Sequence, residues 1–349
     1  MKIRSVLLGT AAALAGFSGA HAADAIVAAE PEPMEYVRVC DAFGTGFFYI
    51  PGTETCLKIG GYVRFQVDWN DDGDRNWDAR TRALLNFDAR TDTEMGALRS
   101  FIAFRGWAAS DYGRSSTDAD TTFEIDEAYI TLGGFKVGYM YNYWDNDLSG
   151  ETDDIGSNRV NAIGYEYDGG SFTAGLFAEE LTRSYSDRDN SVYDDNSTVG
   201  LDGQISGTFG PVTAYLLGAY DFAAEDGSVR GIVSADVGPG AFSVAGIWSS
   251  GVNAYYDLSE WTVAAQYAAK FGKFTITPAA QYWGTIDVND SGDFTGDRDM
   301  WRVGATLDYA ITEGLAFKTT VNYTKVDDDG TVGFDDDNWS GFVRLQRTF

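Results

Sequence analysis

Polar and apolar residues alternate along most of the chain from Lys58 onward, in segments of about 9 to 13 residues. In the segment Leu315–Lys325, for example, Leu315, Phe317 and Tyr323 alternate with polar residues. Side chains of successive strand residues point to opposite faces. Each segment therefore predicts a β-strand with one apolar face and one polar face.

Two kinds of connection separate these segments. Short turns that contain glycine lie near Thr93–Gly96, Gly133–Gly134, Asp168–Gly170, Phe209–Pro211, Gly238–Gly240, Phe271–Gly272 and Thr312–Gly314. Long loops rich in Asp, Asn and Ser lie near Asn70–Asp78, Trp107–Thr121, Asn142–Asn158, Leu181–Asn196, Ala223–Gly227, Gly251–Asp257, Asp287–Arg298 and Asp327–Asp337. The seven turns and eight loops alternate strictly and would connect 16 strands. The pattern predicts an all-β fold, a 16-stranded antiparallel transmembrane barrel with all turns at one end and all loops at the other.

Alternation alone fits a soluble β-sandwich as well as a membrane barrel. Segment length favours the barrel, because sandwich strands usually have about 5 or 6 residues and tilted membrane strands about 9 to 11. Aromatic residues also gather at segment ends, including Trp69, Tyr141, Trp261 and Trp301, as in the aromatic girdles of membrane barrels. The final segment likewise ends on Phe349.

Composition narrows the partners and the fold class. The 53 acidic and 25 basic residues give a net charge of −28, which argues against nucleic acid, because its binding needs a basic face. Aromatic residues make up 15% of the chain, too many for a disordered acidic protein. No run of 18 apolar residues occurs in the body of the chain, which excludes a helical membrane protein. The mean hydropathy of −0.22 does not exclude a barrel, whose strands alternate polar and apolar residues.

The first 22 residues predict a bacterial secretory signal peptide. Lys2 and Arg4 precede an apolar run, Val6–Phe17, and Ala20–Ala22 offers a small-x-small cleavage site. Removal of residues 1–22 would leave 23 basic residues against 53 acidic ones and would remove His21, the only histidine. A mature chain without imidazole excludes Ser-His-Asp and Cys-His catalysis and metals held by His. We therefore expect no enzyme, no metal site and no other cofactor, although composition alone does not exclude a hydrolase with an aspartate pair.

Cys40 and Cys56 are the only cysteines. In an exported protein two cysteines can form a disulfide, worth roughly 3 kcal/mol for a loop of this length in the chain-entropy model. Two free buried thiols are the alternative. We interpret residues 23–57 as an N-terminal segment, either a plug or a strap along the first strand, and residues 58–349 as the barrel.

Sixteen strands would enclose a lumen too wide for side chains to fill. A polar inner face then predicts a water-filled channel, which needs a constriction to set its size limit and charge preference. The candidate constriction is the third long loop, with the acidic residues Asp145, Asp147, Glu151, Asp153 and Asp154. Opposite it we expect a basic wall of inward arginines from the first three strands: Arg64, Arg80, Arg82, Arg90, Arg99 and Arg105. The alternative is a solvated external loop and scattered arginines.

Several stretches resemble the general-diffusion porins of alphaproteobacteria. The matching stretches are VRVCDAFGTGFFYIPGTETCLKIGGYVRF (Val37–Phe65), similar to the N-terminal signature of the family, NWSGFVRLQRTF (Asn338–Phe349), similar to its last strand, ADAIVA (Ala23–Ala28) and AYITLGGFKVG (Ala128–Gly138). The resemblance implies a 16-stranded outer-membrane trimer whose third loop folds into each channel. It implies the loop role for the five acidic residues, the basic-wall role for Arg64, Arg80, Arg82, Arg99 and Arg105, and pairing of Cys40 with Cys56.

We therefore predict an outer-membrane porin, a passive channel for small hydrophilic solutes and ions. Its expected partners are outer-membrane lipid, lipopolysaccharide and two further copies of the chain in a homotrimer. The acidic loop and the net charge predict a weak preference for cations, which the arginines oppose. The alternatives are a substrate-selective barrel and a surface adhesion or binding barrel. For the latter, acidic loops such as Asp335–Asp337 would either bridge cations to lipopolysaccharide or simply be solvated.

Overall fold

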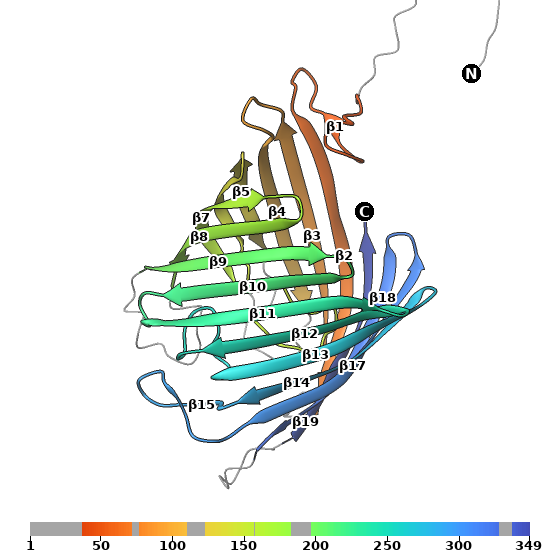
Figure 1. Cartoon of the computed structure of the whole chain (residues 1–349). Coiled ribbons are helices and arrows are strands. Elements are labelled where there is room, and N and C mark those ends of the chain that lie inside the picture. Colours follow the sequence, from red (N-terminus) through yellow and green to blue (C-terminus); the bar gives the residue numbers. More distant parts are fainter. Residues whose placement is uncertain (1–36, 72–76, 110–122, 157, 183–196, 328–336) are drawn as a thin grey trace, which may run out of the picture. The chain divides into compact units, whose positions relative to one another are not determined.

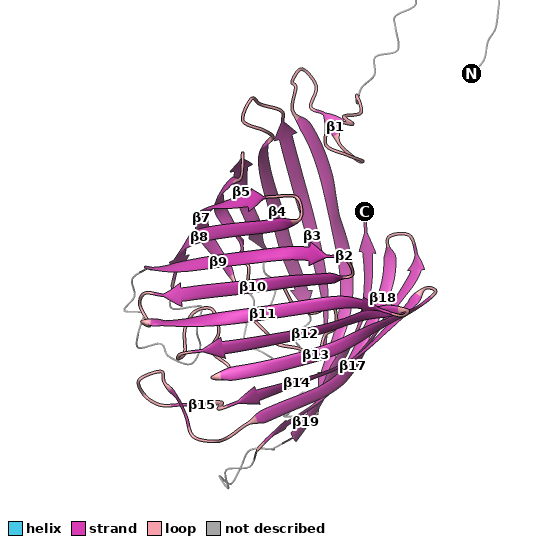
Figure 2. Ribbon diagram, in the orientation of Figure 1, coloured by secondary structure: helices cyan, strands magenta, loops and turns pink. Residues whose placement is uncertain are grey.

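The computed structural model of the chain describes residues 37–71, 77–109, 123–156, 158–182, 197–327 and 337–349. The predicted signal peptide, residues 1–22, and the adjoining residues 23–36 lie outside the described residues. Every regular element of the described residues is a β-strand (Figure 2). No helix in these ranges is long and apolar enough to cross a membrane.

The described residues form nineteen strands, which Figure 1 labels where space permits. They are β1 (Phe48–Tyr49), β2 (Cys56–Asn70), β3 (Trp77–Thr91), β4 (Leu98–Ala109), β5 (Phe123–Leu132), β6 (Phe135–Tyr141), β7 (Arg159–Asp168), β8 (Phe172–Leu181), β9 (Thr198–Phe209), β10 (Val212–Asp221), β11 (Asp226–Val237), β12 (Gly240–Ser249), β13 (Trp261–Phe271), β14 (Phe274–Gly284), β15 (Asp287–Val288), β16 (Phe294–Thr295), β17 (Met300–Thr312), β18 (Leu315–Val326) and β19 (Asp337–Thr348).

Sixteen of these strands close into an antiparallel barrel. From β2 to β14, and then through β17, β18 and β19, each strand pairs with the next along the chain. The ring closes where β19 pairs with β2, from Ser340 opposite Asn70 to Thr348 opposite Tyr62. The short strands β15 and β16 form a separate hairpin between β14 and β17. The predicted 16-stranded antiparallel barrel is therefore confirmed.

The two faces of the barrel follow the alternation in the sequence. On β2, Ile59, Val63 and Phe65 are exposed on the outer face, whereas Gln66 is buried on the inner one. The same pattern continues around the ring, with Ile205 and Leu216 exposed on the outside of β9 and β10. Because these apolar side chains point away from the lumen, most polar residues of the strands lie on the inner face. From β10 to β12 that face also carries the buried apolar side chains Leu217, Ile232 and Ile247.

Within the described residues the connections agree with the sequence pattern, with one correction. Most of each of the predicted loops Asn70–Asp78, Trp107–Thr121, Leu181–Asn196 and Asp327–Asp337 lies outside the described residues. Short turns join β3 to β4 and β5 to β6, the latter through Gly133 and Gly134, whose positive φ angles suit glycine. The predicted long loop at Ala223–Gly227 is wrong, because β10 and β11 are joined only by Phe222–Glu225. The acidic and small residues there indicated a loop, but the last two of them, Asp226 and Gly227, extend the ladder of β11. We call the two ends of the barrel the turn end and the loop end.

The N-terminal segment lies at the turn end of β2. Its strand β1 pairs with the start of β2, and a disulfide joins Cys40 to Cys56. Both cysteines are buried and pack with Phe47. The pairing expected from the sequence is therefore present, and β2 begins at Cys56 rather than at Lys58.

Candidate functional site

Asn142–Asn158, which we call loop L3, joins β6 to β7 and begins with a closed base. The Asn142 backbone N–H donates to the Asn158 carbonyl at 3.0 Å. The Asn142 side chain accepts a hydrogen bond from the Trp144 N–H and donates one to Glu179 of β8. Because Glu179 is buried on the inner face, these bonds turn the chain inward where β6 ends.

A buried arginine of β11 holds both arms of L3. Arg230 is 1% exposed, and its guanidinium donates to the carbonyls of Tyr143, Trp144 and Ile155 at 2.7 to 2.9 Å. The Tyr143 N–H in turn donates to Asp202 of β9 at 3.1 Å. Burying a charged group is costly unless it is hydrogen-bonded. The three carbonyls satisfy the guanidinium of Arg230, and these charge-assisted hydrogen bonds in turn fix the position of the loop.

Neutral side chains on the far strands bind the middle of L3. Their bonds run from the Gly150 N–H to Gln266 of β13, from the Glu151 N–H to Thr306 of β17, from the Asp154 N–H to Gln281 of β14, from Gln281 back to the Asp154 carbonyl, and from Asn322 of β18 to the Glu151 carbonyl. Their lengths are 2.6 to 3.0 Å. The loop therefore crosses the lumen and is attached to the wall opposite its base.

Glu151 adds a charged contact at the far wall. Its carboxylate accepts from Lys318 of β18 at 2.9 Å and lies 3.2 Å from Arg344 of β19. The predicted partners of the acidic loop were arginines of the first three barrel strands. The cations that bind Glu151 directly come from β18 and β19 instead, because the loop reaches across to these strands.

The other four predicted acidic residues lie along the same loop. Asp145, Asp147 and Asp154 are exposed, whereas Asp153 is partly buried and accepts from the Leu148 N–H at 3.1 Å. Enclosure within the loop, together with the nearby carboxylates of Asp153 and Asp145, raises the pKa of Asp147 to about 7. The loop therefore carries a charge that changes near neutral pH.

Four of the predicted arginines form a row on the inner face of β2, β3 and β4. Arg64 lies directly opposite Arg82, and Arg80 is the next inward residue of β3. Arg64 donates to the amide of Gln346 at 2.8 Å, and Arg80 pairs with Asp68 at 2.9 Å. Neutral and acidic acceptors on the wall thus hold two members of the row.

The fourth member of the row, Arg105 of β4, belongs to a network with two acids of β5. Arg105 binds Glu124 and lies 2.9 Å from Asp126, and Arg159 of β7 lies 2.8 Å from the same Asp126 carboxylate. A register shift between β4 and β5 leaves Asp126 as the extra residue of a β-bulge, a feature that re-aims side chains. The sequence alternation did not reveal this bulge or the network.

Arg99 and Arg90 form a separate cluster around Asp88. Arg90 donates to Asp88 at 2.7 and 2.9 Å, and Arg99 at 3.0 Å. Arg99 lies six residues from Arg105 along β4, roughly 20 Å toward the turn end. The expected single wall is therefore wrong for these two arginines, since shared parity fixes the face of a residue but not its height.

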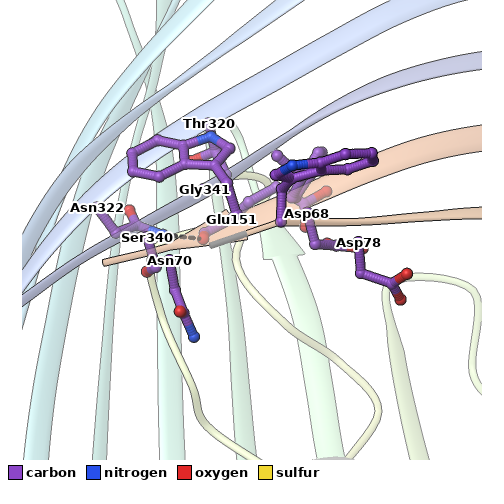
Figure 3. Close-up of a pocket in the computed structure, with 11 residues that line it drawn as sticks. Asp68, Asn70, Asp78, Glu151, Thr320, Asn322, Ser340 and Gly341 are labelled. Atoms are coloured by element: carbon purple, nitrogen blue, oxygen red, sulfur yellow. Dashed lines mark hydrogen bonds between the residues drawn. The ribbon is translucent and has the colours of Figure 1, made fainter. Parts of the chain in front are cut away.

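A hollow of about 350 Å³ lies beside Glu151, between the loop and the wall (Figure 3). Polar residues that line it are Asp68, Asn70, Asp78, Glu151, Thr320, Asn322 and Ser340. The strands β2, β3, β18 and β19 contribute the wall side. Trp69, Trp77 and Phe342 line the hollow as well. L3 therefore narrows the lumen and leaves a space of mixed polar and aromatic lining next to the strands that carry the arginine row.

Several residues that shape this site were not singled out in the sequence. They are Arg230, Lys318, Arg344, Gln266, Gln281 and Asp126. All but Asp126 have inward parity in a regular strand, a signal that marks dozens of other positions as well. Which of these positions contact L3 depends on the path of L3 across the lumen, and L3 is distant from most of them in sequence.

Comparison with known proteins identifies the family. A model described as "Porin subfamily" matches residues 24–346. The chain belongs to this porin family. It is 48% identical to the putative outer membrane protein y4fJ of Sinorhizobium fredii, over 100% of this chain and 99% of the relative. It is 35% identical to porin Omp2a of Brucella melitensis, over the whole of both chains.

Solved structures support the fold. The outer membrane channel DcaP of Acinetobacter baumannii matches with a TM-score of 0.62 at 16% identity, over 86% of this chain and 99% of that one. Together with the closed barrel and the relatives, the family makes this protein an outer-membrane porin, a channel formed by 16 strands with a loop folded into the lumen.

Proposed function

We propose that this porin is a passive diffusion channel for small hydrophilic solutes and ions, with L3 as its constriction. The observation that carries the proposal is the attachment of L3 to both sides of the lumen, through Arg230 near its base and through Gln266 and Thr306 beyond. A loop held at both ends narrows the lumen without a moving part. Solutes then pass through the hollow beside Glu151.

The charges at the constriction support a weak preference for cations. Asp145, Asp147 and Asp154 are exposed on L3, whereas three members of the arginine row are held by acceptors on the wall, two of them by carboxylates. Carboxylates that face the solution attract cations into a narrow passage. Paired arginines offset this field less than free ones would.

We further propose the assembly and export of the chain as the sequence implies them. Residues 1–22 are a cleaved signal peptide, and an N-terminal segment follows from residue 23. The barrel extends to residue 349, and its first strand begins at Cys56, two residues before the boundary at Lys58 that the sequence predicts. The protein forms a homotrimer in contact with outer-membrane lipid and lipopolysaccharide. It carries out no catalysis and needs no cofactor.

Recording from the purified protein in a planar lipid bilayer tests the proposal. We expect conductance in steps of three equal levels, one for each channel of a trimer. In a gradient of potassium chloride, the reversal potential should show a small excess of potassium permeability. Absence of conductance would refute the channel, and an anion-selective reversal potential would refute the cation preference.

A further inference from the structure

Arg82 differs from the other three arginines of its row. The Nε atoms of Arg80 and Arg82 are both enclosed without a hydrogen-bond partner, but Arg80 lies 2.9 Å from the Asp68 carboxylate. No carboxylate lies within ion-pair distance of Arg82 among the residues that the structure describes. Arg64 lies directly opposite on β2, and Arg105 is close enough to repel the same charge. The carboxylate of Asp126 attracts this charge from beyond ion-pair distance, but Asp126 already pairs with Arg105 and Arg159. Like charges directly opposite each other on a sheet are unfavourable. The wall therefore holds a cationic group that lacks its own counter-ion.

Aromatic rings surround this guanidinium. Its carbon lies 4.7 Å from the ring centre of Trp107 and 5.8 Å from that of Tyr62. Trp107 is the direct cross-strand partner of Arg82 on β4, and Tyr62 comes from β2. Rings attract the face of a guanidinium but cannot accept its in-plane hydrogen bonds. The contacts thus orient Arg82. Because its Nε is enclosed, the N–H donors of the two terminal nitrogens are the ones left for another acceptor.

The neighbouring arginines show what that acceptor would be. Arg80, Arg105 and the more distant Arg99 all bind carboxylates of the wall. A guanidinium is a planar fork that matches the two oxygens of a carboxylate or a phosphate. At Arg82 the wall supplies the fork, a second cation in Arg64 and two aromatic contacts, but no described carboxylate within ion-pair distance.

We propose that Arg82, together with Arg64, is a binding site on the channel wall for small oxyanions, namely solutes with a carboxylate or phosphate group. The site rests on the proposed function, since its ligand would reach Arg82 through the open lumen. A passing oxyanion completes the ion pair that the wall lacks and relieves the repulsion between the two arginines.

Current block by oxyanions tests this site. Single-channel conductance of the full chain is recorded in potassium chloride while inorganic phosphate, or separately acetate, is added at constant ionic strength. We expect a saturable reduction of the chloride current by one or both probes. In Arg82→Gln the half-saturating concentration should rise about tenfold, because the fork and its charge are both lost.

Two further variants separate recognition from the general field. Arg82→Lys keeps the charge but loses the planar fork, so we expect a smaller rise in the half-saturating concentration. Arg99→Gln removes the same charge near the turn end and should change the block less than about twofold, as distance and salt screen it. Circular dichroism, and conductance in chloride alone, establish that each variant is folded and open.

The outcomes distinguish this inference from the channel itself. A channel that conducts chloride but shows no saturable block by either probe would overturn the oxyanion site and leave the porin function intact. Equal effects of Arg82→Gln and Arg99→Gln would also overturn it, since the block would then reflect the overall charge. An Arg82→Lys channel indistinguishable from the wild type would overturn recognition through the fork. Loss of chloride conductance in the wild type would refute the proposed function instead.

Discussion

The two sides of the lumen use polar residues differently. On β13, β14, β17 and β18, the neutral side chains of Gln266, Gln281, Thr306 and Asn322 bind the backbone of L3. On β2 to β5, arginines and carboxylates form ion pairs along the wall, and the hollow beside Glu151 borders β2 and β3. One side positions the loop, whereas the other gives the passage its charges.

This difference separates shape from selectivity. Amides and hydroxyls can fix a backbone without adding to the electric field of the channel, because they carry no net charge. Charged residues near the passage can then vary in sequence without releasing the loop. Several charged groups are exceptions because they also hold L3. They are Arg230, Arg302, Asp202, Glu179 and, on the loop itself, Glu151.

The largest effect is expected from Arg230→Met. The variant removes hydrogen bonds to the carbonyls of Tyr143, Trp144 and Ile155, and L3 should lose about 3–5 kcal/mol of docking free energy. The single-channel conductance should rise toward that of an unobstructed barrel. Arg302→Met is the matched control, because Arg302 donates a single hydrogen bond, to the Thr152 carbonyl, among the described residues of L3. An unchanged conductance in Arg230→Met would mean that the neutral residues suffice to hold the loop.

A smaller effect is expected at the charged side, where Arg105 and Arg82 can be compared directly. Arg105→Gln leaves the nearly buried Asp126 with only Arg159 as an ion-pair partner within the described residues, so the free energy of unfolding should fall by about 2 kcal/mol. Arg82→Gln removes no ion pair among the described residues, and the free energy of unfolding should change by less than about 0.5 kcal/mol. Urea unfolding followed by tryptophan fluorescence measures both. Equal losses would show that Arg82 is as firmly integrated into the wall as Arg105.

Glu151→Gln tests whether the acid at the boundary of the two sides contributes to selectivity. The variant frees Lys318 and Arg344 from their shared partner beside the hollow. The ratio of cation to anion permeability should fall about twofold, the effect of roughly 0.4 kcal/mol from one charge acting through water. Reversal potentials in a salt gradient give the ratio, and Asp308→Asn, which also borders Lys318, is the control. A ratio that falls equally in both variants would deny Glu151 a special position.

The smallest effect concerns pH. Because the pKa of Asp147 is raised to about 7, this carboxyl is charged above neutral pH and becomes neutral below it. Cation preference should therefore decrease as the pH falls from about 8 to about 6, by less than about twofold. Reversal potentials measured across this range should lose most of their pH dependence in Asp147→Asn. A dependence that persists in the variant would assign the titration to another group.

The sequence was sufficient for the barrel but not for the site. A period of two residues identifies strands and faces locally, which is why the strand number, the closure and the inward position of the arginines could be predicted. The site depends on contacts between distant segments, such as Glu151 with Lys318, which lie 167 residues apart. A register shift like the one at Asp126 also changes the face of later residues without any mark in composition.

The seam between β2 and β19 has a consequence for biogenesis. Arg64 and Gln346 are hydrogen-bonded across it although 282 residues separate them in sequence. The barrel therefore cannot close before nearly the entire chain has reached the membrane. Until then the sheet has two unpaired edge strands. The backbone N–H and C=O groups of these edges would find no hydrogen-bond partner in the hydrocarbon core of the membrane. Such distant pairing is intrinsically slow. The incomplete sheet must therefore be kept out of the lipid, in water or bound to an assembly factor, until its first and last strands pair.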